Sequence, residues 1–532
     1  MVTYESNLCN RKKEAQVGNM KTGIEYGVRD LLLALSKGAQ IEVEHAVLVL
    51  LYMDKPYTTE DSCLTFYTNG DEKVIIPVRD PGRVKKILEE MALEYGHSIF
   101  DIKNYVKHNF SLLLEDHRKS SLGKYYTPEH LVGLVHELVK PYVSQDSYVL
   151  DLAAGSGAFL GPFKGKRIIA ADIDRIAVLI LKALGFESAR YDNSLVNICR
   201  AKYALKESDH IIVVGNPPYN DVTSRNKKYG RFAKQRIRVE MDKDILTNDL
   251  GISFLRAFNK LKADVICVLH PLSYLIKKTN FGNKLGEFRR NYVLKRAVVF
   301  PSREFADTQQ TPFPVVAALY QRDMIGMDYD YIRNFEFEIL HDKRSFVLAR
   351  IETIDGYIRK YPPVKRDKNK KSDIGLYMHN IRDINSLITI GYLTEKEDFD
   401  RHITINYCDL YKYAYLNCMR RYLEKDFKFG NLSPIVDRRE LERDEFLRDA
   451  FVIDTIINNQ RLSVFDVKNK SSIVYMNSLA EEYERKRREC AGKEPGIYTM
   501  FLEFLSSGSV DVSPLRRFIA QYFERLKTKM IC

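Results

Sequence analysis

The middle of the chain alternates short apolar runs with stretches that have the apolar spacing of a helix. The apolar runs lie at residues 148–152, 167–171, 210–214, 265–269, 297–300 and 315–320. One helical stretch covers residues 175–184 and ends at Gly185, a residue suited to closing a helix. Strands that alternate with helices favour a parallel, doubly wound sheet with helices on both faces. We therefore predict an α/β domain over residues 119–325.

The pattern is different before this domain. Residues 1–118 have mostly helical apolar spacing, as at residues 84–91, and a predicted hairpin interrupts them. The hairpin turn is Asn69-Gly70, between the run at 64–67 and the apolar residues 74–76. This segment is predicted to be a helical N-terminal extension, and the sequence indicates no chemistry for it.

The regular alternation ends after Arg322. A basic run at residues 365–371 follows Pro362-Pro363 and is predicted to be an exposed loop. Ser513-Pro514 predicts the start of a final helix. The remainder mixes apolar runs with charged helical stretches, so we predict a separate C-terminal mixed α/β domain over residues 326–532, a usual domain size.

Composition narrows the class of protein. The 532 residues are 45% hydrophobic and 29% charged, as in a folded globular protein, and the formal charge of +12 suits a polyanionic partner. The eight cysteines include no CxxC pair, so neither a zinc site nor a disulfide framework is indicated and a reducing cytoplasm is expected. The longest apolar run, at residues 46–53, is too short to span a membrane, and residues 1–13 lack a signal-peptide core.

A turn of small residues follows the first apolar run of the α/β domain. Asp151 leads into Ala153, Gly155 and Gly157. Such a turn lets the backbone approach a ligand where a Cβ atom would clash, and in an open α/β sheet it lies at the carboxyl edge, where ligands bind. A dinucleotide fold shares this arrangement, but the third glycine of its motif would fall at Leu160. A nicotinamide cofactor is therefore the weaker interpretation.

Two acidic residues end the next two predicted strands. Asp172 follows the run at 167–171 and is placed to accept hydrogen bonds from ribose hydroxyls. Asp192 ends the following strand, where a carboxylate could accept a hydrogen bond from an adenine amino group. Taken alone, Asp192 is equally well interpreted as a solvated loop acid.

The most specific signal is Asn216-Pro217-Pro218-Tyr219, directly after a buried apolar run. An amino group conjugated to a purine ring is a poor nucleophile because its lone pair is delocalised. The Asn216 side-chain oxygen and the Pro217 carbonyl are suited to accept its two protons, with two prolines holding the turn rigid. Tyr219 offers a ring face for a base taken out of the double helix. The alternative is a proline-rich turn after a buried strand.

With these motifs in this order, the chain resembles the amino-group DNA methyltransferases, in the gamma-class order typical of type II restriction-modification enzymes. The resemblance covers residues 123 to about 322. Asn216 to Tyr219 matches the catalytic motif, and residues 268–275 resemble a later strand-and-proline segment. Pro162 and Gly165 depart from the family pattern, because they leave room for only a short helix after the glycine turn.

The cofactor residues that the resemblance implies come from three further motifs. Residues 123–128 are similar to the family's first cofactor motif, the turn at 151–157 matches its glycine motif, and two strand ends match its ribose and adenine contacts. The expected cofactor-binding residues are Thr127, Asp151, Ala153, Gly155, Gly157, Asp172, Ile173 and Asp192.

The resemblance also implies an activity. The fold would be a Rossmann-like methyltransferase sheet, the cofactor S-adenosylmethionine, and no metal would be required. Methyl transfer would go to N6 of an adenine flipped out of double-stranded DNA, and a cognate restriction endonuclease is a candidate partner. The family stacks the flipped base on an aromatic residue; Phe305 is expected there, with Phe300 and Phe313 as alternatives. The C-terminal domain would recognise the target sequence.

A basic cluster follows the catalytic motif and is predicted to contact phosphates near the flipped base. A solvated face is the alternative interpretation. The cluster consists of Arg225, Lys227, Lys228, Arg231, Lys234, Arg236 and Arg238.

Three other functions compete with DNA methylation. Release-factor glutamine methyltransferases share the catalytic motif but need no large recognition domain, and RNA remains an alternative substrate. A fused nuclease would use Asp454, Asp466 and Lys468, although short matches of this kind are common. A non-catalytic DNA-binding subunit would not need the pocket around Asn216.

Overall fold

The structure is a computed structural model that divides into two compact units. The first comprises residues 1–298, 304–308 and 316–329, and the second residues 299–303, 309–315 and 330–532. Each unit is described by itself. The described residues are 20–38, 41–60, 62–67, 73–95, 101–106, 127–219, 240–304, 312–360, 372, 376–379, 393–394, 402–423, 429–435, 447, 450–452, 454–455, 458 and 513–529.

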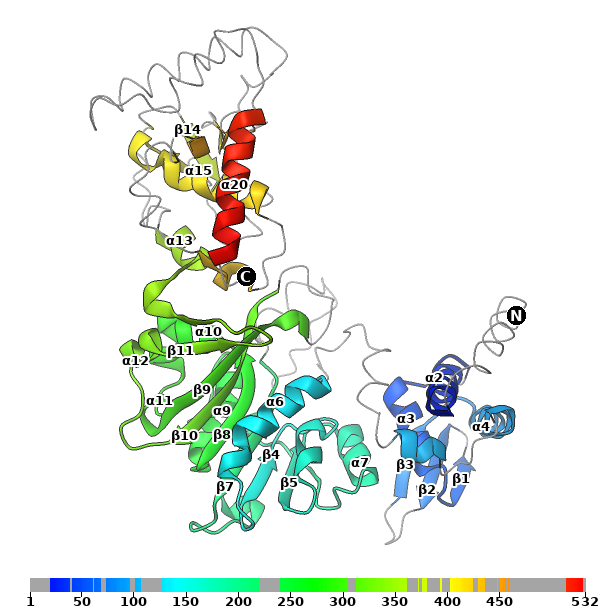
Figure 1. Cartoon of the computed structure of the whole chain (residues 1–532). Helices are drawn as coiled ribbons and strands as arrows, with labels where there is room; N and C mark the ends of the chain where they lie inside the picture. Colours follow the sequence, from blue (N-terminus) through cyan, green and yellow to red (C-terminus); the bar gives the residue numbers. More distant parts are fainter. Residues whose placement is uncertain are drawn as a thin grey trace. The chain divides into compact units, whose positions relative to one another are not determined.

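The N-terminal part of the first unit combines helices with a small sheet (Figure 1). Its elements are α2 (Met20–Gly38), α3 (Val43–Tyr52), β1 (Tyr57–Glu60), β2 (Cys63–Tyr67), β3 (Lys73–Pro77) and α4 (Pro81–Tyr95). The predicted hairpin is confirmed, because β2 and β3 pair antiparallel with Phe66 opposite Val74. A third strand that the sequence did not predict, β1, pairs on the other edge of β2 with Tyr57 opposite Phe66. The helical extension therefore carries a three-stranded meander.

A nine-stranded sheet forms the centre of the structure. Its strand order is β12-β11-β9-β10-β8-β7-β4-β5-β6. The strands are β4 (Tyr148–Asp151), β5 (Arg167–Asp172), β6 (Arg190–Tyr191), β7 (Ile211–Gly215), β8 (Val265–Pro271), β9 (Tyr292–Pro301), β10 (Pro314–Arg322), β11 (Glu336–Ile339) and β12 (Ser345–Val347). The pairs β5–β6, β4–β5, β4–β7 and β7–β8 are parallel. This confirms the predicted doubly wound, mainly parallel α/β sheet.

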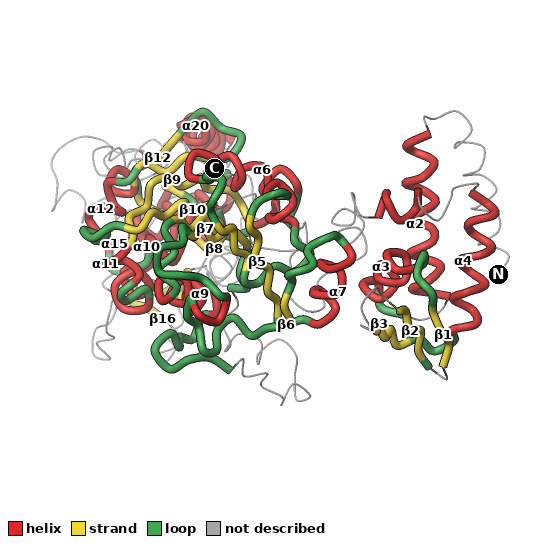
Figure 2. Tube along the Cα trace, turned by 90° about the horizontal axis from the view of Figure 1, so that it is seen from below, coloured by secondary structure: helices red, strands yellow, loops and turns green. Residues whose placement is uncertain are grey.

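Helices cover both faces of this sheet, as the alternating pattern predicts. Helices α6 (Glu129–Val139) and α9 (Leu250–Lys260) lie on opposite faces (Figure 2). Helix α7 (Arg175–Ala183) follows β5, and Gly185 ends it in the left-handed region at φ +97°. After the glycine turn only the short 3₁₀ helix η2 (Ala158–Phe163) forms, with Pro162 inside it, as Pro162 and Gly165 predict. Short helices α10 (Ser273–Ile276), α11 (Phe288–Asn291) and α12 (Tyr329–Asn334) complete this part.

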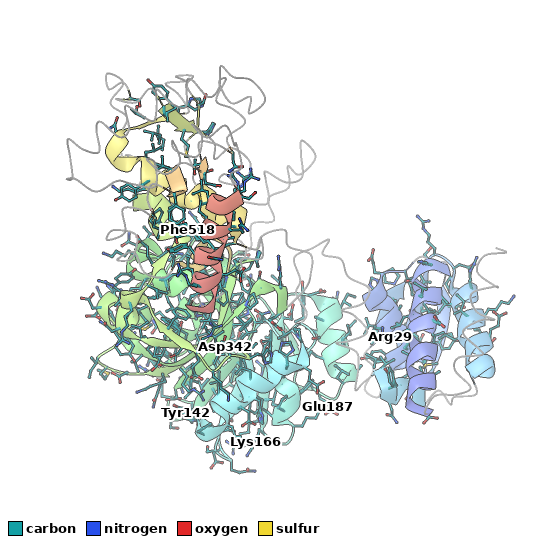
Figure 3. All side chains as sticks on the ribbon, turned by 45° about the horizontal axis from the view of Figure 1, so that its top comes forward. Arg29, Tyr142, Lys166, Glu187, Asp342 and Phe518 are labelled. Carbon is teal, nitrogen blue, oxygen red and sulfur yellow. The ribbon has the colours of Figure 1, made fainter. Side chains whose placement is uncertain are left out.

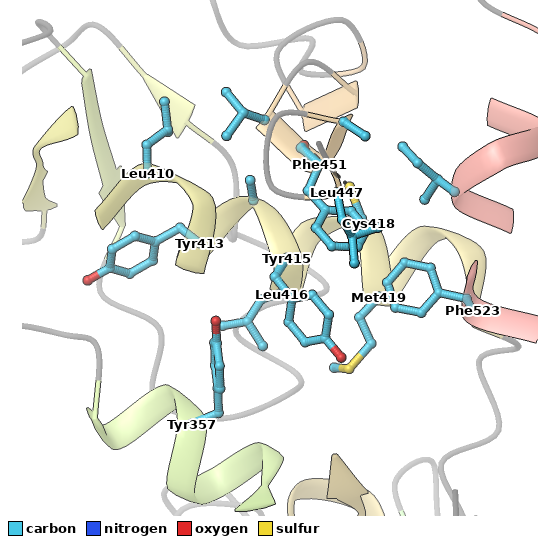
Figure 4. Close-up of a cluster of buried hydrophobic side chains, with 14 of the residues drawn as sticks. Tyr357, Leu410, Tyr413, Tyr415, Leu416, Cys418, Met419, Leu447, Phe451 and Phe523 are labelled. Atoms are coloured by element: carbon cyan, nitrogen blue, oxygen red, sulfur yellow. Dashed lines mark hydrogen bonds between the residues drawn. The ribbon is translucent and has the colours of Figure 1, made fainter. Parts of the chain in front are cut away.

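The second unit has its own hydrophobic core. A three-stranded sheet has the order β15-β14-β16. Its strands and the accompanying elements are α13 (Ile354–Lys360), β14 (Leu376–His379), β15 (Leu393–Thr394), β16 (His402–Ile405), α15 (Tyr407–Tyr422) and α20 (Ser513–Lys529). Tyr415 of α15, Phe451 and Phe523 of α20 are fully buried and pack together (Figure 4). Helix α20 begins at the predicted Ser513.

Asp454 belongs to the interior of this second unit. Its side chain is 1% exposed and accepts hydrogen bonds from Arg421 at 2.8 Å and from Tyr422 at 2.6 Å. These contacts give Asp454 a structural place in the core. The other two residues of the nuclease interpretation, Asp466 and Lys468, lie outside the described residues, so that interpretation stays untested.

No helix in the part of the chain that the structure describes is both long enough and apolar enough to cross a membrane.

Candidate functional site

A cavity of about 270 Å³ opens at the carboxyl ends of the central strands. Strand β4 has β5 on one side and β7 on the other, so the chain reverses its direction across the sheet at β4. Such a reversal leaves a crevice outside the carboxyl ends of the strands, and ligands of doubly wound sheets bind there. The predicted site residues that line the cavity are Thr127, Asp151, Ala153, Gly155, Asp172, Ile173, Asp192, Asn216, Pro217 and Tyr219.

The carboxylate of Asp172 organises the glycine turn. One oxygen accepts the N–H of Gly155 at 2.7 Å, and the other accepts the N–H of Asp174 at 2.8 Å. Gly155 has φ +51° and Gly157 has φ +76°, a region that favours glycine. A Cβ atom on Gly157 would lie 2.5 Å from Leu181 Cδ2, so this predicted residue supports the turn against α7 from outside the cavity lining.

Asp151 lies beneath both the glycine turn and the catalytic motif. Its side chain is 2% exposed, and one carboxyl oxygen accepts the N–H of Ala153 at 3.2 Å. A Cβ atom on Gly215, the residue before Asn216, would lie 2.8 Å from the same oxygen, so only glycine fits there. Burial raises the pKa of Asp151 from 3.8 to about 8; the Ala153 N–H opposes this, and the charge of Asp172 adds to it. Burial therefore favours the protonated form of Asp151 near neutral pH.

Replacing Asp151 by asparagine should flatten the dependence of stability on pH. The unfolded chain ionises Asp151 above its ordinary pKa of 3.8, whereas the folded chain keeps the proton up to about 8. Between these values stability falls as pH rises, by about 1.4 kcal/mol per pH unit from this group. We expect the melting temperature of the cofactor-free wild type to fall more steeply from pH 5 to pH 8 than that of Asp151→Asn. Parallel curves would show that Asp151 is ionised in the folded protein.

Asp192 lies at the cavity beside Asp172, with its carboxylate already engaged. Lys202 Nζ lies 2.9 Å from one oxygen, and the Tyr203 hydroxyl donates to the other at 3.1 Å. The backbone N–H of Asp192 donates to the Asp172 carbonyl at 2.9 Å, which fixes the end of β6 next to β5. Asp192 is thus a held cavity residue rather than a solvated loop acid, and its contact with adenine stays a prediction.

Asn216 lines the cavity, and its side-chain oxygen is unsatisfied among the described residues. Its side-chain nitrogen donates to Thr127 Oγ1 at 3.3 Å, which sets the orientation of the amide. Its side-chain oxygen is buried, and no donor among the described residues reaches it. Pro217 is buried and Pro218 exposed, so the turn is fixed on one side only. A buried acceptor without a partner is rare in folded proteins, and it points to a donor that arrives with a ligand.

Tyr219 lies against the beginning of α9, a contact between residues too far apart in the chain to be predicted. A Cβ atom on Gly251 would lie 3.0 Å from Tyr219 Cβ and 2.6 Å from the Tyr274 hydroxyl. The same hydroxyl donates to Asp249, which caps α9 and accepts the N–H of Gly251 at 3.0 Å. Glycine at position 251 therefore leaves room for the turn from Asn216 to Tyr219 to pack against the start of α9.

Helix α9 also supplies two cavity residues that sequence reasoning missed, Leu250 and Phe254. They belong to the apolar face of an ordinary amphipathic helix, and such a face is the same in sequence whether it covers a core or a ligand. The cavity is consequently walled by apolar groups on this side and by the polar strand ends on the other.

Two sets of predicted residues near the site cannot be compared with the structure. Phe305 and the basic cluster between Arg225 and Arg238 lie outside the described residues. Of the alternatives to Phe305, Phe300 is fully buried in β9 and absent from the cavity lining, so it serves the core. The base-stacking residue stays a prediction.

Comparison with known proteins gives one family match. Residues 111–195 match the family model described as N-6 DNA Methylase. The matched segment contains Thr127, the glycine turn, Asp172 and Asp192. It confirms the sequence prediction of an adenine-specific DNA methyltransferase that uses S-adenosylmethionine. No curated protein matches the chain.

Several solved structures are similar to the chain at low identity. A protein described as a class I S-adenosylmethionine-dependent methyltransferase from Listeria monocytogenes has 11% identity and a TM-score of 0.37, over 58% of this chain and 89% of that one. The modification subunit of what is described as a type I restriction enzyme from Vibrio vulnificus has 14% identity and a TM-score of 0.36, over 58% and 70%. A type I restriction-modification methyltransferase subunit from Streptococcus thermophilus has 15% identity and a TM-score of 0.31, over 45% and 54%.

The cavity fits S-adenosylmethionine by the chemistry of its lining. Asp172 and Asp192 line the cavity and would accept hydrogen bonds from ribose hydroxyls and an adenine amine, and Ile173 and Phe254 would offer apolar surface to a ring. A Cβ atom on Gly155 would project into open space, since nothing lies within 4 Å of it, and glycine leaves this space free for a ligand. When bound, the cofactor would supply an electrophilic methyl group.

Proposed function

We propose that this enzyme takes a target adenine out of double-stranded DNA, binds it beside Asn216 and directs methylation to its N6 atom. The observation that carries the proposal is the buried side-chain oxygen of Asn216, which no donor among the described residues reaches. An exocyclic amine offers two N–H donors, and one of them would satisfy this oxygen. The family match supports adenine as the base.

Asn216 and Pro217 would activate the amine, and Thr127 would hold Asn216 in place. Hydrogen bonds from the two amine N–H groups to the Asn216 oxygen and the Pro217 carbonyl would favour a pyramidal nitrogen, whose lone pair is free to attack. Thr127 fixes the amide so that its oxygen, not its nitrogen, is available. The rigid setting of the turn on β7 and α9 means that little reorganisation is required in the transition state.

We propose that the region after the catalytic domain recognises the target sequence. We infer an N-terminal extension over residues 1–118, a catalytic domain over 119–325 and a target-recognition domain over 326–532. If the enzyme belongs to a restriction-modification system, it would act on DNA in the cytoplasm. A cognate endonuclease would then be its functional partner.

Base flipping can be tested with 2-aminopurine, an adenine analogue whose fluorescence rises when it is unstacked. A duplex carrying the analogue at the methylated position is titrated with the enzyme, and a duplex with the analogue at a neighbouring position serves as the control. We expect a rise only for the target position, because only that base leaves the stack. Binding without a rise at the target position would show that the base stays in the helix.

The basic cluster should contribute to binding through phosphates. Each lost phosphate contact lowers the salt slope of binding by about one unit and carries no sequence information. Replacing Lys227, Lys228 and Arg231 by alanine should therefore weaken binding to target and non-target duplexes by similar factors. Titration of both duplexes at several salt concentrations measures this. An unchanged slope would make the segment a solvated face, and a loss confined to target DNA would make it a base reader.

A further inference from the structure

Helix α3 of the N-terminal extension is apolar on every side. Its side chains from Ala46 to Tyr52 are all buried, most of them completely. A helix that is hydrophobic all round must be covered all round. Helix α2 and strand β3 of the extension cover part of α3, and helix α7 of the methyltransferase sheet covers another part (Figures 1 and 2). The extension therefore uses a methyltransferase helix to complete its own core.

Helix α7 is shared between this core and the cofactor cavity. Ile176, Ala177 and Ile180 line the cavity. Ile176 and Ile180 also belong to the hydrophobic cluster around α3, together with Leu179, which does not line the cavity. A single helix thus has the cofactor on one side and the extension on another.

A hydrogen bond joins the end of α3 to α7. The Tyr52 hydroxyl donates to the Leu179 carbonyl at 3.2 Å. At the other end of α3, burial lowers the pKa of His45, while the nearby carboxylates of Glu42 and Asp174 oppose this effect. Asp174 caps α7 by accepting the N–H of Ile176 at 3.0 Å. Its own N–H donates to Asp172, the predicted ribose acid.

Side chains fill the region on both sides of this contact. Arg29 on α2 marks the extension, and Glu187, just after α7, marks the methyltransferase side (Figure 3). The contact from α3 through α7 to Asp172 runs within the first unit of the structure.

We propose that the N-terminal extension stabilises the cofactor site. Helix α3 packs on α7 and thereby fixes the position of the cavity wall and of Asp172. The inference rests on the assignment of S-adenosylmethionine to this cavity. Cofactor binding and docking of α3 then favour each other, because coupling between two sites is reciprocal. Tyr52 is a positioning residue, which acts on the cofactor only through α7.

Amide hydrogen exchange of the full chain tests this coupling. Addition of S-adenosylmethionine should slow exchange in α7 and also in α3, although no residue of α3 lines the cavity. Helix α20 in the second unit serves as an internal reference. Slower exchange in α7 with unchanged exchange in α3 would overturn the inference and leave the cofactor assignment intact. If the cofactor changed neither helix, the cofactor assignment would fail and the inference with it.

A pair of tyrosine variants provides a matched comparison. Tyr52→Phe removes the hydroxyl bonded to Leu179, whereas Tyr67→Phe removes a hydroxyl that pairs with Thr58 Oγ1 at 3.1 Å, within the small sheet. A neutral hydrogen bond corresponds to about a two- to tenfold change in an equilibrium constant. We expect Tyr52→Phe to speed exchange in α3 by a factor in this range, and Tyr67→Phe to leave it unchanged. Equal effects of the two variants would contradict a specific contact with α7.

Leu179→Ala should change the affinity for S-adenosylmethionine more than Tyr52→Phe does. It removes apolar surface from the α3 side of α7 without touching the cavity lining. We expect the dissociation constant of S-adenosylmethionine, measured by calorimetry, to rise at least fivefold, within the usual range of coupling between sites. Circular dichroism checks that the chain is folded. A folded Leu179→Ala chain with wild-type affinity would overturn the inference.

Discussion

Replacement of Asn216 by alanine is expected to slow methyl transfer about 10²- to 10³-fold, the usual cost of losing one preorganised polar group at the reacting centre. The side-chain oxygen of Asn216 is buried and has no hydrogen-bond partner among the described residues. The side-chain nitrogen donates to Thr127 Oγ1 at 3.3 Å. Removing it takes away an acceptor for the target amine but none of the acceptors proposed for the cofactor. Affinity for S-adenosylmethionine should therefore stay within a few-fold of wild type.

Single-turnover kinetics with saturating cofactor measures the effect of Asn216→Ala on methyl transfer. Calorimetric titration with the cofactor alone measures its effect on cofactor affinity. Thr127→Val is the matched variant: it keeps the shape of the side chain but loses the hydrogen bond that orients the Asn216 amide. We expect a smaller loss, about tenfold, because the oxygen is still present but less well held. If Asn216→Ala lost cofactor affinity and kept its turnover rate, Asn216 would belong to the cofactor pocket instead.

Replacement of Asp172 by alanine is expected to have the opposite signature, with cofactor affinity reduced about 100-fold and turnover at saturating cofactor largely kept. Asp172 holds the glycine turn through Gly155 and the start of α7 through Asp174. Its loss removes the proposed acceptor for the ribose hydroxyls and leaves two backbone N–H groups without their partner. A lost hydrogen bond to a charged group costs about 1.5–3 kcal/mol, and loss of the ribose acceptor at the upper end of this range corresponds to about the expected change in affinity.

Two variants at neighbouring positions sharpen this experiment. Asp172→Asn keeps one acceptor oxygen and the packing, so its affinity should fall between those of wild type and Asp172→Ala. Asp174→Ala leaves both Asp172 oxygens in place and removes the helix cap at Ile176, which is worth about 1 kcal/mol. Calorimetric titration of the three variants should therefore rank Asp174→Ala closest to wild type. Wild-type affinity in Asp172→Ala would remove this residue from the cofactor site.

The strands and turns of the site are predictable because their signals are local. Each apolar run that ends in Asp151, Asp172 or Gly215 became a strand of the parallel sheet, and the carboxyl ends of parallel strands meet at one edge. The short helix after the glycine turn follows from the backbone limits of Pro162, which no tertiary contact removes. These features depend on residues that are neighbours in the chain.

Features that depend on distant residues could not be predicted. The bond between Asn216 and Thr127 joins positions 89 residues apart, and nothing in either local sequence specifies the other. Leu250 and Phe254 have the spacing of any helix packed on a sheet, so their place at the cavity depends on tertiary structure. The apolar run of α3 was visible in the sequence, but its cover, α7, is more than a hundred residues further along the chain.

The central claim is methyl transfer to the exocyclic amine of adenine, and the chemical identity of the methylated base tests it most directly. Duplex DNA is incubated with the purified chain and isotope-labelled S-adenosylmethionine, digested to nucleosides and analysed by mass spectrometry, with Asn216→Ala as the control. The site geometry predicts label in N6-methyldeoxyadenosine and almost none with the variant. Label on cytosine, or equal labelling of adenine by Asn216→Ala, would contradict it.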